Sequence, residues 1–120
     1  MAKNLDISIL LDFYGDMLTE KQRDVVVFYY NEDLSLAEIA QNCGITRQGV
    51  RDSIKRAEAQ LIQYEERLGL AERFDKIQSS LELIIKYAKD IDLLNMRYGG
   101  PREVFDHVEK IVNLASNLQE

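Results

Sequence analysis

The chain has 120 residues, 46% of them apolar and 30% charged, with a net charge of −6 and one cysteine. This length predicts one ordinary domain, or a small domain with a helical extension, and one cysteine excludes an intrachain disulfide. No stretch approaches the roughly 18 apolar residues of a transmembrane helix and no signal peptide is visible, so we expect a cytoplasmic protein without membrane insertion. The acidic balance argues against a protein that coats nucleic acid without sequence preference, because neutralising phosphates requires Lys and Arg.

Two helices are predicted before residue 31. The first covers residues 5–18 despite Gly15, because apolar side chains recur there at helical spacing, namely Ile9, Leu10, Phe13, Tyr14 and Met17. The second begins at Thr19, which forms a capping box with Gln22. The side chains that it is expected to bury are Val25, Val26, Phe28 and Tyr29. Residues 31–35 then form a connector.

The next segment has the pattern of a helix-turn-helix. Ser35 and Glu38 form a capping box, so a helix is predicted from about Leu36 to Asn42. Gly44 can adopt the left-handed conformation that ends a helix, and Thr46 can cap the next one. Small or apolar residues would form the contact between the two helices, namely Ile39, Ala40, Ile45, Val50 and Ile54. This arrangement is typical of a helix-turn-helix.

Three long helical segments follow. Apolar residues at alternating steps of four and three predict that the second helix of the motif continues from Arg47 to residue 68. Gly69 interrupts this pattern, and a second long helix continues it as far as residue 98. Gly99 suits a C-terminal cap, and Pro101 suits the first turn of a final amphipathic helix. The predicted fold is therefore all-α, with a four-helix domain over residues 1–63 and a C-terminal helical packing or interaction segment over residues 64–120.

Basic residues concentrate at the start of the second helix of the motif. Residues 46–57 contain four basic side chains and one acidic side chain, Asp52. At about 100° per residue, these polar side chains lie opposite the apolar face of the helix, where a recognition helix meets the major groove. Arg47 and Arg51 are candidates for guanine contacts and Gln48 for adenine. The candidates for phosphate contacts are Lys55 and Arg56 on this helix and Lys21 and Arg23 on the helix that precedes the motif.

The same residues carry a family resemblance. The segment Leu18–Val26, Ala37–Ala40 and Gly44–Thr46 resembles region 4 of bacterial sigma factors over roughly residues 18–61. The whole chain is similar to the YlxM family, small sigma-region-4-like proteins of Gram-positive bacteria whose gene neighbours that of the signal recognition particle GTPase. This resemblance implies a DNA-binding helix-turn-helix protein and a role around the signal recognition particle, with its RNA or its GTPases as partners.

Two classes of function stay open on the sequence, and an enzyme is not expected. The first is a DNA-binding regulator, and the second is an interaction protein that uses its C-terminal helices to bind signal recognition particle components or a second copy of itself. No catalytic constellation is present, and we expect neither a cofactor nor a metal, since His107 has no second His or Cys nearby. Cys43 is expected to be structural. Tyr29 and Tyr30 could stack on bases, but a place in the core is favoured for Tyr29.

Overall fold

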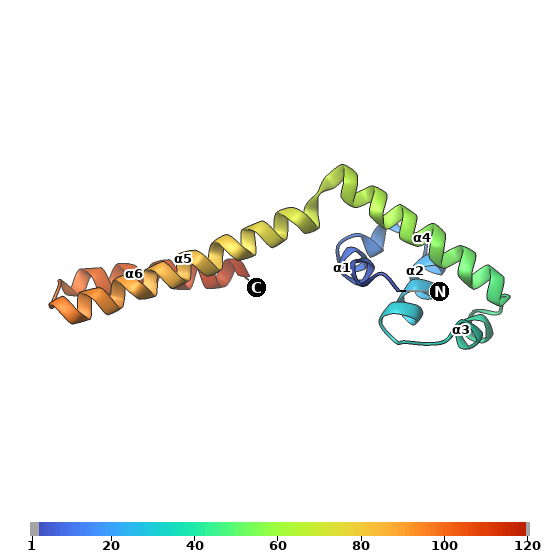
Figure 1. Ribbon diagram of the computed structural model, residues 1–120, viewed down its shortest axis with the longest axis horizontal. Coiled ribbons are helices and arrows are strands. Elements are labelled where there is room, and N and C mark those ends of the chain that lie inside the picture. Colours follow the sequence, from blue (N-terminus) through green and yellow to red (C-terminus); the bar gives the residue numbers. More distant parts are fainter. Residues whose placement is uncertain (1–2, 120) are drawn as a thin grey trace. The chain divides into compact units, whose positions relative to one another are not determined.

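The computed structural model describes residues 3–119, and every element of regular secondary structure in this part of the chain is a helix (Figure 1). Its α-helices are α1 (Leu5–Tyr14), α2 (Glu20–Tyr30), α3 (Leu36–Cys43), α4 (Arg47–Leu68), α5 (Leu70–Tyr98) and α6 (Arg102–Gln119), with a short 3-10 helix, η1 (Gly15–Met17). The chain divides into two compact units, residues 1–71 and 72–120. The all-α prediction is confirmed. Tyr64, which the sequence assigned to the C-terminal segment, packs against the core of the first unit.

Helix α4 is the centre of the first unit. It packs against α1, α2 and α3, and its residues at helical spacing are fully buried, namely Val50, Ile54, Ala57 and Leu61. From the other helices, the most completely buried side chains are Ile7, Tyr14, Val26 and Ile39. The core of this unit is therefore built around one face of α4.

The predicted helix starts around the motif are confirmed by their hydrogen bonds. The Thr19 and Ser35 hydroxyls accept from the backbone N–H groups of Gln22 and Glu38 at 3.2 and 3.1 Å. The Gln22 and Glu38 side chains accept from the backbone N–H groups of Thr19 and Ser35 in return, which completes both capping boxes. These reciprocal bonds satisfy N–H groups that a helix start leaves unpaired.

Three expectations for the first half of the chain are corrected. The first helix ends at Tyr14 rather than at residue 18, because the chain tightens into η1 at Gly15. Ile9 and Met17 are both 52% exposed, whereas Leu10 and Tyr14 of the same expected set are buried. The other buried residues of this segment are Ile7, Leu11 and Leu18. Phe28 is only half-buried, because the core face of α2 passes through Val25, Val26, Tyr29 and Tyr30.

Two tyrosine hydroxyls tie α4 to distant parts of the first unit. The Tyr30 hydroxyl donates to Glu58 Oε2 at 2.8 Å and accepts from the Asn4 backbone N–H at 3.2 Å. Burial, followed by the bonded Glu58 carboxylate, raises the pKa of Tyr30 to about 12. The Tyr14 hydroxyl donates to Glu65 Oε1 at 2.6 Å and accepts from the backbone N–H at the start of α5 at 3.0 Å. Both bonds hold α4 in a fixed register against its neighbours.

The second unit is an antiparallel pair of helices, α5 and α6 (Figure 1). The Gln78 side chain donates to the Gln119 backbone carbonyl at 3.4 Å, and the Asn95 side chain donates to the Pro101 carbonyl at 3.0 Å. Gly99 adopts a positive φ of 65° at the turn between the helices, as its position before Pro101 predicts. The end of α6 therefore lies beside Gln78, well inside α5.

Candidate nucleic-acid interface

A three-residue turn joins α3 to α4. Gly44 has a φ of 68°, and its backbone N–H donates to the Ala40 carbonyl, which also accepts from the Ile45 N–H at 3.1 Å. The Thr46 hydroxyl then accepts from the Gly49 N–H at 3.0 Å and starts α4. These bonds place the first turn of α4 directly after α3, as in a helix-turn-helix.

The contact between α3 and α4 differs from the expectation at one position. Ile39, Ala40, Val50 and Ile54 are buried as predicted, but Ile45 is 43% exposed. Ile45 directly precedes the capping residue of α4, so its side chain leaves the core and lines a surface hollow. The contact is therefore made by side chains within the two helices and not by the turn.

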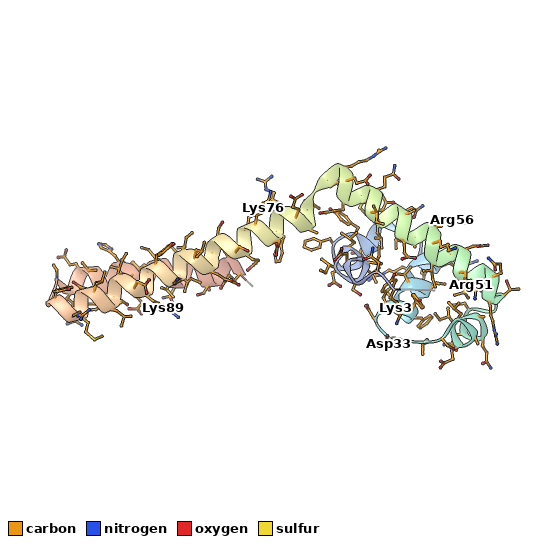
Figure 2. The ribbon with its side chains drawn as sticks, in the orientation of Figure 1. Lys3, Asp33, Arg51, Arg56, Lys76 and Lys89 are labelled. Carbon is orange, nitrogen blue, oxygen red and sulfur yellow. The ribbon has the colours of Figure 1, made fainter. Side chains whose placement is uncertain are left out.

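The polar face of α4 is open to solvent. All five candidate residues of α4 are exposed, namely Arg47, Gln48, Arg51, Lys55 and Arg56. Arg51 lies nearer the α3 end of α4 than Arg56 does (Figure 2). Because the buried residues of α4 recur at positions 50, 54, 57 and 61, the candidates occupy the remaining positions around the helix. One helix thus carries both the core contact and the candidate interface.

The basic side chains of this face are not neutralised by acidic partners in the described part of the chain. Within residues 3–119, none of Arg47, Arg51, Lys55 and Arg56 forms an ion pair. Asp52 accepts a hydrogen bond from the Gln48 side chain at 3.0 Å. The first turn of α4 contains no acidic residue, so its free N–H groups and its dipole also favour an anion. The local field is therefore attractive to phosphate although the chain as a whole is acidic.

The two candidates on α2 differ in their surroundings. Lys21 lines the same surface hollow as Asn42, Cys43 and Ile45, so the structure brings it next to the turn of the motif. Arg23 is also exposed, but its guanidinium pairs with Asp16 at 2.8 Å, and it does not line this hollow. Lys21 is therefore the α2 residue that extends the basic face of α4.

The hollow beside the turn was not foreseen from the sequence. It is lined by residues of α2, α3, the turn and α4, namely Lys21, Asp24, Val25, Phe28, Asn42, Cys43, Ile45 and Ser53. Cys43 is half-buried there as a free thiol. The sequence signal that could have indicated an apolar surface at this point was an isoleucine immediately before a helix cap, outside both helices.

Other candidate chemistry is not assembled into a site. Tyr29 and Tyr30 are buried and contact each other edge to face at 5.1 Å, so neither presents its ring for stacking on a base. His107 is exposed on α6, and no group of three His, Cys, Asp or Glu side chains suited to a metal occurs among the residues described. In the same part of the chain, no helix has the length and apolar character needed to cross a membrane.

Comparison with known proteins gives a consistent family match. Residues 1–97 match the model of UPF0122, described as helix-turn-helix protein, YlxM / p13 like. A UPF0122 protein of Clostridium perfringens is 51% identical over 114 residues, which covers 94% of this chain and 99% of the relative. A UPF0122 protein of Clostridium kluyveri is 48% identical over 93% of this chain and 96% of the relative. A UPF0122 protein of a Thermoanaerobacter species is 42% identical over 95% of this chain and 94% of the relative.

Proposed function

Because the chain belongs to the UPF0122 family of YlxM / p13 like helix-turn-helix proteins, we propose that it is a DNA-binding regulatory protein that inserts the start of α4 into the major groove. The observation that carries this proposal is the set of cations at the start of α4 that are exposed and that form no ion pair within residues 3–119, on the side away from its buried face. The protein acts in the cytoplasm by binding and not by catalysis.

Each residue of the interface has a role that follows from its chemistry. Arg47 and Arg51 present planar guanidinium groups for bidentate contact with guanine, and Gln48 can bind adenine once its bond to Asp52 opens. Phosphate contacts fall to the remaining basic residues, namely Lys21, Arg23, Lys55 and Arg56. Arg23 must first leave its pair with Asp16, so its contribution should be the smallest of these.

A second candidate function rests on the C-terminal unit. Large apolar side chains of α5 and α6 are exposed there, which favours an interaction protein. In this alternative the protein acts on signal recognition particle components, its RNA or its GTPases, as the resemblance to YlxM implies. Duplex RNA has a deep, narrow major groove that α4 cannot read, so RNA binding would depend on phosphates or exposed loops.

The test is a binding titration with two labelled probes, a pool of random-sequence duplex DNA and the signal recognition particle RNA. On random-sequence DNA, where Arg47 and Arg51 have no preferred base to bind, all four cations of α4 contact phosphates. The logarithmic salt slope is then about −3.6, and affinity for DNA falls about 100-fold between roughly 50 and 200 mM salt. The variant with Arg47→Ala, Arg51→Ala and Lys55→Ala should lose most of this binding and more than half of the slope.

A matched control separates the interface from overall charge. Substituting Lys86, Lys89 and Lys110 with alanine removes the same charge from exposed positions of α5 and α6, and binding should stay within about twofold. RNA binding without DNA binding would favour the second candidate. If the parent protein binds neither probe at about 50 mM salt, the nucleic-acid proposal is wrong.

A further inference from the structure

The contact between α5 and α6 has a small core for helices of this length. Its buried side chains are Leu81, Ala88, Val108 and Ala115, so two of the four are alanines. Polar residues share the row of α5 that faces α6, namely Gln78, Asp92 and Asn95, all half-buried. The Asp92 Oδ1 atom is buried without a hydrogen-bond partner among residues 3–119. Two helices that bury so little are marginal without a further partner.

A second apolar row runs along each helix at a fixed offset from the buried residues. On α5, large apolar side chains lie three and six residues after Leu81 and three and six residues after Ala88. On α6, they lie three and six residues after Val108 and three residues after Ala115. These side chains form what we call the outer face, namely Ile84, Tyr87, Ile91, Leu94, Ile111, Leu114 and Leu118. Each is 43% to 67% exposed.

The two rows lie on one side of the helix pair. At about 100° per residue, offsets of three and six place each row roughly 60° to 120° around its helix from the buried contact, in the same rotational sense. Because α5 and α6 are antiparallel, equal rotations in each helix's own direction turn both rows toward the same side (Figure 1). The outer face is therefore one continuous surface across both helices.

The opposite side of the pair is polar. Positions one residue after the four buried side chains are Glu82, Lys89, Glu109 and Ser116, and all but Ser116 are exposed. Lys89, which projects from α5 in Figure 2, marks this side. A helix pair with one apolar and one polar side has the pattern of half of a four-helix bundle.

We propose that the outer face binds the outer face of a second copy of this chain, so that α5 and α6 of two protomers form a four-helix bundle around a two-fold axis. At about 200 Å² for a fully exposed large apolar side chain, the outer face offers about 800 Å² per copy, which is what each partner contributes to a stable interface of standard size. A two-fold contact joins identical surfaces, and an apolar surface is complementary to itself.

The charge of the outer face and the constant presence of other copies of the chain both favour a second copy over a different partner. The outer face contains no Asp, Glu, Lys or Arg, and residues 72–120 as a whole carry seven basic and nine acidic side chains, so two copies meet without strong repulsion. A helix pair with so small a core needs its partner whenever the chain is present. A second copy is the partner that is always available.

Sedimentation equilibrium on the full chain over about 1–100 µM tests this interface, a range that spans weak and strong dimers. The parent protein should have twice the 13.9 kDa mass of one chain. Substituting Ile91 and Leu94 with glutamate should give the single mass, with dimer affinity at least about 100-fold lower, because four carboxylates would face each other in an apolar contact. Alanine at the same two positions should still weaken the dimer about tenfold, and it should leave the helix intact because alanine is the strongest helix former.

The matched control places glutamate at Leu83 and Leu93, which are 49% and 62% exposed on the same helix but lie outside the outer face. This control should stay dimeric, and circular dichroism should show parental helix content. The inference is wrong if the parent sediments as a monomer at about 100 µM, even if another protein binds it, since a dimer of this area should form well below that concentration. It is also wrong if the control dissociates as readily as the outer-face variants, or if those variants stay fully dimeric.

Discussion

Ile54 and Lys55 are adjacent in sequence but lie on different faces of α4, about 100° apart around the helix. Ile54 is fully buried among α1, α2 and α3, whereas Lys55 is exposed and has no ion pair within the described residues. If α4 carries the core on one face and the interface on the other, alanine at these two positions should have separate effects. The first should lower stability and leave binding intact, and the second should do the reverse.

The size of the first effect follows from burial. Ile54→Ala removes three buried carbons, which costs about 2.4 kcal/mol in transfer and about 3 kcal/mol or more once the cavity is included. For a domain of this size each kcal/mol lowers the melting temperature by about 4–8 °C, so the melting temperature should fall by roughly 15 °C. Ile62→Ala, the same change at a position 40% exposed on the same helix, should cost under about 1 kcal/mol.

The second effect is electrostatic. Lys55→Ala should change the unfolding free energy by less than about 0.5 kcal/mol, because it removes an exposed side chain with no partner in the described part of the chain. It should also reduce the slope of log affinity against log salt for DNA by about 0.9, the contribution of one phosphate contact. Thermal melts followed by circular dichroism measure the first quantity, and anisotropy titrations at about 10 °C, where Ile54→Ala is still folded, measure the second.

Two results would refute this division of α4. A loss under about 1 kcal/mol for Ile54→Ala would mean that the core is not built around α4. A Lys55→Ala variant with unchanged affinity and unchanged salt slope, while the parent binds DNA, would remove Lys55 from the interface.

Two further predictions concern the tyrosine bond and the turn. Burial raises the pKa of Tyr30 from about 10 to about 12, so the folded state favours the neutral phenol, and this stabilisation is full below pH 10 and lost as pH rises toward 12. The urea-unfolding free energy should therefore fall more steeply over that window in the parent than in Tyr30→Phe, and equal slopes would contradict the assignment. Gly44→Ala should cost about 1–2 kcal/mol in the same assay through backbone strain alone, because an added Cβ at Gly44 meets no atom within 4 Å. Gly44→Asn should cost less, and a loss above about 3 kcal/mol would indicate a clash instead.

Local chemistry could be predicted from the sequence because neighbouring residues determine it. Thr19 with Gln22 and Ser35 with Glu38 satisfy helix starts three residues away, and Gly44 supplies a positive φ that other side chains resist. The exposure of the basic residues of α4 follows from the same periodicity, since the buried positions leave them no other side of the helix. Their role in binding stays a prediction.

Long-range features could not be predicted in this way. The bonds from Tyr14 to Glu65 and from Tyr30 to Glu58 join residues 51 and 28 positions apart, and their spacing in the sequence carries no signal. The apolar pattern of α5 reads as one stripe from the sequence alone. The structure divides it, because α6 covers Leu81 and Ala88 and leaves the residues three and six positions later exposed.

The division of α4 into a buried face and a solvent face has a consequence for divergence among relatives. Since its fully buried residues are Val50, Ile54, Ala57 and Leu61, selection for folding acts most strongly on these positions and leaves the solvent positions free to vary. Relatives could therefore change the nucleotides they prefer by single substitutions at the solvent positions without weakening the scaffold. In such a helix, the nucleotide preference can change while the buried residues that maintain the fold stay the same.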